Sequence, residues 1–325
     1  MKTLEDLKGF YASSLSASMR ELEEKRKRIA VRIYAIIFGS VSVLLVSFLL
    51  ALALKNPVAV IIACIIVLVL GIILYLIFVN GESKAFRSEF KTRIVGEVVK
   101  FIDPNLGYRP ELGVGQGTYM DSQIFLTNPD RYKCEDYVSG KIGETFIEFS
   151  EVHSEYKTET RDSKGHRQTH WHTIFRGLFF IADFNKNFSG TTVVLPDLAE
   201  KTFGFLGKIF QSWNLTRNGK LIKLEDPEFE KLFVVYGDDQ ITARYILTPG
   251  LMQRLVEFRS RLNNTIYLSF RNSKVYVAIS VGKDLFEPSI LCSNDRLDLI
   301  REYFENLALA GRIIEELNLN TRIWK

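Results

Sequence analysis

The sequence predicts an α+β protein: an N-terminal helix and a two-helix transmembrane hairpin, then a mixed, mostly antiparallel cytoplasmic domain with a long C-terminal helix. Three observations predict this class. An almost unbroken apolar stretch runs from Val31 to Val79, strand-like alternation begins at Tyr137, and an amphipathic helical pattern covers Asp295–Leu319. The chain has 325 residues, which is enough for the hairpin and one or two domains with real cores.

The apolar stretch divides into two spans, Val31–Leu54 and Val58–Val79, of 24 and 22 residues. A helix needs about 20 residues to cross the hydrocarbon core of a bilayer, so either span is long enough. Lys55-Asn56-Pro57 separates them, and Pro57 suits both a turn and the first position of a helix. Only Arg32, at the edge, is charged within the spans, and ionisable groups inside a membrane usually mark a transport path. The pattern therefore predicts an anchor.

The basic residues of the chain concentrate beside these spans. Residues 1–100 hold 14 Lys/Arg and 8 Asp/Glu, whereas residues 101–325 hold 28 and 30. The flanking basic residues are Lys25, Arg26, Lys27, Arg28, Lys84, Arg87, Lys91 and Arg93, and only Lys55 lies between the spans. The positive-inside rule then predicts a multi-pass membrane protein with both termini in the cytoplasm. No nucleic-acid partner is expected, because the domain after the spans has no basic excess.

We expect four segments along the chain. Residues 1–30 form an amphipathic cytoplasmic helix, 31–79 the transmembrane hairpin (31–54 and 58–79), 80–105 a juxtamembrane helix, and 106–325 the cytoplasmic α+β domain. The first helix packs on its own domain, docks a partner or lies on the membrane surface. The expected strands are Tyr137–Tyr156, His170–Phe184, Thr191–Leu195, Leu221–Leu224, Leu232–Tyr236 and a hairpin of Thr265–Arg271 with Lys274–Val281; the expected helices are Asp197–Trp213, Pro227–Lys231, Pro249–Asn263 and Asp295–Leu319.

All four histidines fall between His153 and His172. If residues 162–165 form a four-residue hairpin loop, the register sets Glu155 opposite His172 and places His153, His170 and His172 on one face. Together with Glu155 as an oxygen ligand, these side chains could hold a metal. A one-residue change of loop would move one strand's side chains to the other face. A metal site, a hairpin that contacts a partner or lipid headgroups, and a plain solvated hairpin therefore all remain open.

No motif of an assignable reaction occurs in the chain. There is no nucleophile elbow, no catalytic Cys/His spacing and no H-E-x-x-H, and the glycine-rich Gly113–Gly117 lacks the Lys-Ser/Thr of a phosphate loop. Cys64, Cys134 and Cys292 are sparse and far apart, which fits a reducing compartment. We expect no cofactor and favour a role that is not enzymatic.

Three blocks of the sequence resemble the signature blocks of an uncharacterised bacterial family. They are Ile174-Phe175-Arg176-Gly177-Leu178-Phe179, Asp226-Pro227-Glu228-Phe229-Glu230-Lys231-Leu232-Phe233, and Asp239-Gln240 with Ala243-Arg244-Tyr245-Ile246-Leu247-Thr248-Pro249. The resemblance covers roughly residues 10–290. It implies a two-helix membrane anchor and a cytoplasmic domain of unknown function, and some members are encoded near LemA-type membrane proteins.

The charged residues of these blocks are the candidates for contact with a partner or a phosphate. Arg176 and Arg244 either bind an acidic partner or lipid phosphate, or pair with Asp226, Glu228 or Asp239 to fix loops.

The leading interpretation is a membrane-anchored cytoplasmic interaction module within a bacterial inner-membrane complex. Its partners are the lipid bilayer and either a second copy of the chain or another protein, with a LemA-type membrane protein among the candidates. The alternative is an inner-leaflet lipid- or small-ligand-binding domain. A metal-dependent enzyme that uses the His153–His172 hairpin is the third interpretation.

Overall fold

The computed structural model describes residues 2–54, 57–161, 166–184, 186–197, 220–262, 264–294, 297–317 and 319. The chain divides into two compact units. A helical unit comprises residues 2–98 and 286–302, and a sheet unit comprises residues 99–285 and 303–325. Helices α5 (Gly96–Ile102) and α11 (Leu297–Glu316) each have residues in both units.

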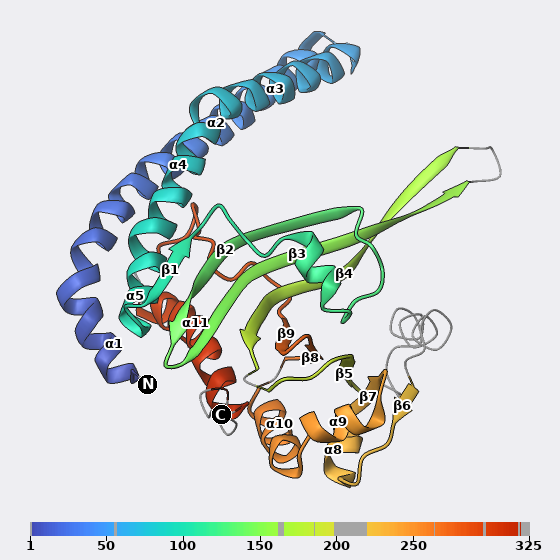
Figure 1. Ribbon diagram of the computed structural model, residues 1–325. Helices are drawn as coiled ribbons and strands as arrows, with labels where there is room; N and C mark the ends of the chain where they lie inside the picture. Colours follow the sequence, from blue (N-terminus) through green and yellow to red (C-terminus); the bar gives the residue numbers. More distant parts are fainter. Residues whose placement is uncertain are drawn as a thin grey trace. The chain divides into compact units, whose positions relative to one another are not determined.

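The helical unit consists of two long helical segments. The first runs through α1 (Leu4–Phe10), η1 (Tyr11–Leu15) and α2 (Ser16–Leu54), and the second through α3 (Pro57–Phe78), α4 (Asn80–Phe90), η2 (Lys91–Val95) and α5. Thr3 begins the first segment with a capping box, in which its hydroxyl accepts from the Asp6 N–H and its own N–H donates to the Asp6 carboxylate. Helices α2 and α3 lie side by side as an antiparallel hairpin (Figure 1).

Each segment contains one π-helical turn, at η1 and at η2. A π turn inserts one extra residue and rotates the side chains that follow, and such turns are frequent at functional positions. η1 begins the small, polar part of the first helix, where the Ser13 hydroxyl donates to the Gly9 carbonyl at 2.9 Å. η2 carries two of the basic residues that flank the second apolar span, Lys91 and Arg93.

The sheet unit is built on one nine-stranded sheet with the order β1-β2-β3-β4-β9-β8-β5-β7-β6 (Figure 1). All strand pairs described are antiparallel. This agrees with the expected α+β class. The strands are β1 (Leu106–Arg109), β2 (Arg131–Ile142), β3 (Thr145–Arg161), β4 (Arg167–Asp183), β5 (Thr191–Pro196), β6 (Lys220–Ile222), β7 (Phe233–Gly237), β8 (Ile266–Arg271) and β9 (Lys274–Ser280).

Two tight turns show where local sequence determined the strand boundaries. Asn272 and Ser273 both have positive φ between β8 and β9, as a two-residue type I′ turn requires, and this hairpin was predicted. The single strand expected over Tyr137–Tyr156 was wrong: Gly143, with φ of 60°, turns the chain between β2 and β3. Glycine at the first central position is typical of a type II′ turn.

An aromatic core covers one face of the sheet. Tyr119, in the short helix α6 (Gln116–Asp121), is fully buried and stacks on Phe125 at 5.5 Å between ring centroids. Both rings pack with Phe175 of β4, and the Tyr119 hydroxyl is hydrogen-bonded to Ser154 at 2.9 Å. Satisfying that hydroxyl lets a tyrosine replace a phenylalanine in the core without leaving a polar atom unpaired.

Three helices lie between β6 and β8 along the chain: α8 (Pro227–Leu232), α9 (Gln240–Ile246) and α10 (Pro249–Arg261). Thr248 caps α10 through a hydrogen bond from the Leu251 N–H, and Pro249 occupies its first turn, as the sequence predicts. The end of α10 is fixed to α11, because Arg254 donates to the Glu316 carbonyl at 2.6 Å and Arg261 pairs with the Glu316 carboxylate at 2.7 Å. The expected helix Asp197–Trp213 lies outside the described residues apart from Asp197.

Candidate functional site

Among the described residues, two helices are long and apolar enough to cross a membrane, within Leu4–Leu50 and Val60–Phe78. Their apolar side chains are largely uncovered by the described part of the chain: Phe38 is 67 % exposed, Leu68 65 % and Ile77 65 %. A soluble protein rarely leaves so large a contiguous apolar surface in water. The residues next to this surface are therefore the first candidates for function.

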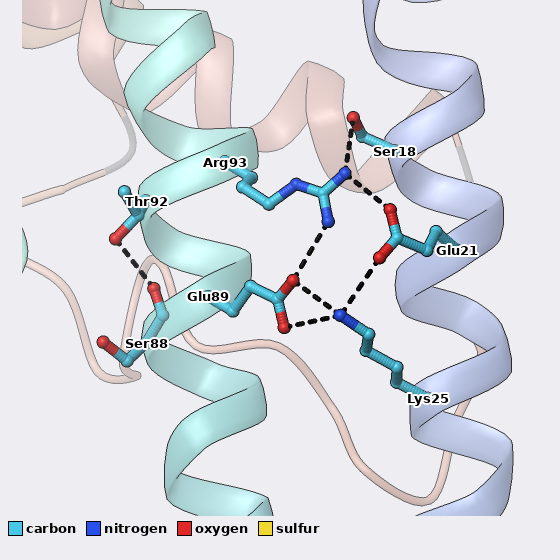
Figure 2. A network of polar contacts seen from close by, with 7 residues as sticks. All are labelled: Ser18, Glu21, Lys25, Ser88, Glu89, Thr92 and Arg93. Carbon is cyan, nitrogen blue, oxygen red and sulfur yellow. Dashed lines mark hydrogen bonds and ion pairs between the residues drawn. The ribbon is translucent and has the colours of Figure 1, made fainter.

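Below the apolar helices, α2 and the α4–η2 segment are joined by a network of charges (Figure 2). Lys25 on α2 pairs with Glu89 at 2.7 Å and with Glu21 at 3.0 Å. Arg93 on η2 pairs with Glu21 at 2.7 Å and with Glu89 at 3.0 Å, and also donates to the Ser18 hydroxyl at 3.2 Å. Two cations and two carboxylates thus form a closed ring across the helix pair.

The ring shifts the pKa values of its members in the direction that keeps all four charged. Hydrogen bonds from Arg93 and then Lys25 lower the pKa of Glu21 to about 2, and those from Lys25 and Arg93 lower the pKa of Glu89 despite its partial burial. The Glu89 carboxylate in turn raises the pKa of Lys25. The ring is consequently intact throughout the physiological pH range.

A buried ion pair on α2 forms hydrogen bonds to the segment 286–294, which we name the strap. The Arg26 guanidinium donates two hydrogen bonds to the Glu23 carboxylate, at 2.9 and 2.8 Å, and a third to the Ile290 carbonyl at 2.8 Å. The Asn294 N–H donates to the same Glu23 carboxylate at 3.3 Å. Burial opposes the charge of Glu23, but the hydrogen bonds from Arg26 and Asn294 outweigh it and lower the pKa of this carboxyl. Bidentate pairing of this kind fixes geometry as well as charge.

The strap also binds the α4–η2 segment. Glu287 pairs with the buried Lys91 at 2.7 Å and with Arg87 at 3.3 Å. Of the eight basic residues that flank the spans, five are therefore paired with carboxylates of their own unit. Within the described chain, Lys27, Arg28 and Lys84 are exposed and have no such partner. We name the assembly of residues 16–30, α4, η2 and the strap the stem.

The carboxylates of the stem were missed by sequence reasoning. Glu21 with Lys25 and Glu89 with Arg93 are spaced four apart on helices, a visible signal for ion pairs. Glu287 carried no local signal, because it lies almost two hundred residues along the chain from the lysine it neutralises.

The predicted histidine register is wrong. Tyr156, not Glu155, lies opposite His172, and Glu155 lies opposite Thr173 after a bulge that follows Ser154. His170 and His172 consequently share a face with Tyr156, which stacks on His172 at 4.9 Å, whereas His153 and Glu155 occupy the other face. Among the described residues no group of three or more His, Cys, Asp or Glu side chains is placed to hold a metal. The proposed quartet is not brought together.

The same two strands continue beyond the rest of the sheet as a two-stranded ribbon (Figure 1). Pairing with β2 ends at Glu155 and pairing with β9 ends at Gly177, so Tyr156–Arg161 and Arg167–His172 pair only with one another among the described strands. Residues 167–173 are all exposed. Trp171 is partly covered by Arg131, whose guanidinium carbon lies 3.5 Å from the ring centroid.

The candidate contact residues of the sheet unit have mainly structural partners. Arg176 pairs with Asp284 at 2.6 Å rather than with any of the acidic residues expected. Asp226 caps α8 by accepting from Glu228 and Phe229 N–H groups, and Asp239 caps α9 by accepting from Ile241 and Thr242 N–H groups. The side chains of Glu228 and Arg244 are exposed.

Near Arg176 the sheet buries a carboxyl group that the sequence did not single out. Glu151 on β3 is 4 % exposed and accepts a hydrogen bond from the Leu285 N–H at 3.0 Å. Burial raises its pKa to about 8, and the nearby carboxylates of Asp136, Asp284 and Glu135 add to this effect. Burial also disfavours the charge of Asp284, but the hydrogen bond and charge of Arg176 outweigh it, and its pKa is lowered.

Fold and site together define an α+β chain in which two exposed apolar helices rise from an ion-paired stem. Residues 173–319 match the family described as "Protein of unknown function (DUF3137)". This range contains all three sequence blocks that resemble an uncharacterised family; for the helices before it the resemblance stays a prediction. No curated protein matches the chain. Among solved structures, that of the mycobacterial trehalose monomycolate transport factor A, TtfA, aligns with a TM-score of 0.35 at 9 % identity, over 67 % of this chain and 96 % of that chain, a level at which no fold or function is transferred.

Proposed function

We propose that this protein is a membrane-anchored interaction module of the bacterial inner membrane. The observation that carries the proposal is the continuity of α2, which passes from the ion-paired stem into apolar surface that no described residue covers. Lipid is the environment in which such a surface is stable. In this proposal α2 and α3 cross the bilayer, and the stem holds the chain rigidly at its exit.

The flanking charges support an orientation with both termini in the cytoplasm. Lysine and arginine residues flank both outer ends of the hairpin, and only Lys55 lies between the spans. Five of the flanking cations are neutralised in the stem. The exposed Lys27, Arg28 and Lys84 keep their charge available to the anionic cytoplasmic leaflet.

The ribbon of β3 and β4 is the surface that best suits a protein partner. A two-stranded ribbon is only marginally stable in water, and its outer edges present unpaired backbone groups. Trp171 and the stacked pair of Tyr156 and His172 add aromatic surface on opposite faces of this ribbon. Aromatic side chains on an open strand edge are typical of a site that binds another chain. A second copy of the chain and a LemA-type membrane protein are the partners proposed.

Site-directed photo-crosslinking in native membranes tests this function. A photoreactive residue in place of Thr169, on the exposed part of the ribbon, should capture a stoichiometric partner or a second copy of the chain. The same residue in place of Ile241, which is 79 % exposed on α9, is the matched control and should capture neither. A monodisperse monomer, extracted at native levels and uncrosslinked from both positions, would contradict the interaction role.

A further inference from the structure

The stem contains a crevice of about 270 Å³ between α2 and α4, directly beneath the apolar helices. Its apolar floor is formed by Ile29, Ala85 and Phe86, and charged side chains, among them Arg28, Arg32 and Glu82, surround it. Most of the surface that faces into it is apolar. It therefore combines an apolar floor with a charged entrance.

The position of the crevice along the helices fixes the depth at which it lies if the anchor spans the bilayer. Phe86 is eight residues beyond Phe78, where α3 ends, and Ile29 is two residues before Val31, where the first apolar span begins. At about 1.5 Å per helical residue, these side chains lie within roughly 3–12 Å of the ends of the apolar spans. The headgroup region of a bilayer is about 5–7 Å thick on each side, so Ile29 lies within it and the crevice extends from it to its aqueous border.

The charges of the crevice favour an anion. Three cations line it, and two carboxylates, Glu82 and Glu89, oppose them. Lys25 is held by Glu89, and Arg32 pairs with Glu82 in an exposed contact. Arg28 is exposed and has no hydrogen bond or ion pair with another described residue. The Arg28 guanidinium at the rim is thus available to a ligand, and a guanidinium binds a phosphate through two parallel hydrogen bonds.

We propose that this crevice binds the headgroup of one acidic phospholipid of the cytoplasmic leaflet, with the phosphate on Arg28 and the upper acyl chain on Ile29, Ala85 and Phe86. The proposal rests on the membrane anchoring proposed above and adds to it a specific lipid site. Arg32 would reinforce the site, since its exposed pairing with Glu82 is weak enough to be exchanged for a phosphate. The apolar floor selects a lipid over a free phosphate, because only a lipid covers it.

The test uses the full chain in a mild detergent, titrated with phosphatidylglycerol or phosphatidylcholine, with bound lipid counted by native mass spectrometry. The intact protein should retain one phosphatidylglycerol in preference to phosphatidylcholine. Arg28→Ala should weaken this binding about tenfold, as expected for the loss of one charge-assisted contact. Lys27→Ala is the matched control: it removes a neighbouring exposed charge that does not line the crevice, and should change binding less than about twofold.

Two further arms separate the alternatives. Ala85→Trp fills the crevice without changing its charge, and should weaken binding as Arg28→Ala does. Inorganic phosphate at the concentration of the lipid should not displace it; displacement would assign the site to free phosphate and overturn the lipid proposal. Equal losses for Arg28→Ala and Lys27→Ala, or no preference for phosphatidylglycerol, would overturn it too. Retention of the protein in membranes after an alkaline carbonate wash reports on the anchor separately, and release of the intact chain would overturn both proposals.

Discussion

Replacing Glu151 with glutamine should remove the pH dependence of stability that results from burying this carboxyl group in the sheet. The pKa of the buried Glu151 carboxyl is about 8 in the folded chain, against about 4.5 for an ordinary glutamate side chain. The folded state therefore binds this proton more tightly than the unfolded state. The stabilisation that the protonated Glu151 contributes is complete below the pKa of the unfolded state and is lost as the pH rises through 8.

The magnitude follows from the two pKa values. Between pH 6 and pH 8 the folded chain passes from almost fully protonated to half protonated at Glu151, whereas the unfolded chain is ionised throughout. The free energy of unfolding should fall by about 2 kcal/mol over this range. Asp284 adds no slope there, because its pKa is lowered and it stays ionised. Glutamine keeps an oxygen for the Leu285 N–H and carries no charge at any pH.

Urea denaturation of the full chain in detergent, followed by far-UV circular dichroism at several pH values, measures this slope. The difference between wild type and Glu151→Gln isolates the one carboxyl group from all other titrations. Glu159→Gln, on the exposed end of the same strand, is the control and should leave the slope unchanged. A Glu151→Gln protein with the same slope as wild type would refute the buried, proton-binding carboxyl.

Three further predictions concern thermal unfolding of the full chain. Arg26→Ala leaves the Glu23 carboxylate buried and unpaired, and should destabilise the stem by about 3 kcal/mol, most of which the additional change Glu23→Leu should restore. Gly177→Ala should cost more than about 3 kcal/mol, because a Cβ there would lie 2.0 Å from the Ile279 carbonyl oxygen and φ is +152°. Ser273→Gly should stabilise the β8–β9 turn by about 0.5 kcal/mol, because glycine adopts its positive φ of 58° without strain.

Each of these three predictions has its own contrary outcome. An Arg26→Ala protein as stable as the wild type would show that the ion pair of Arg26 and Glu23 is not desolvated. Gly177→Ala should be compared with Gly282→Ala, a position with nothing within 4 Å of a built Cβ, and equal stability of the two would contradict the close approach of β4 and β9. A lower melting temperature for Ser273→Gly would contradict the left-handed conformation of that residue.

The parts of the fold that were predicted correctly depend on short stretches of sequence. The β8–β9 hairpin needs only Asn272-Ser273 between two alternating runs, and α10 needs only a threonine cap and a proline in its first turn. The turn at Gly143-Glu144 was missed because polar residues continue the alternation on both sides of it. Nothing in the alternation distinguishes one long strand from two strands joined by two residues.

The site was predicted less well, because it depends on contacts between distant residues. Arg161 lies opposite Arg167 rather than the expected His166, and this one-residue change of register sets Tyr156 opposite His172 and leaves His153 on the other face. The strand alternation alone does not determine where the two strands first pair beside the loop. Likewise, the charge count near the spans did not show how the basic residues are paired. Glu21, Glu23, Glu89 and Glu287 pair with five of the eight flanking cations, and only folding brings Glu287 to Lys91.

The central claim is that α2 and α3 form a membrane hairpin with both ends in the cytoplasm, and cysteine labelling in intact cells tests it most directly. Two single-cysteine chains are compared: one keeps Cys292, which is exposed in the strap, and the other carries Asn56→Cys between the spans. A membrane-impermeant maleimide should label Asn56→Cys from outside and should reach Cys292 only after the cells are permeabilised. Labelling of Cys292 in intact cells, with Asn56→Cys protected, would contradict the account.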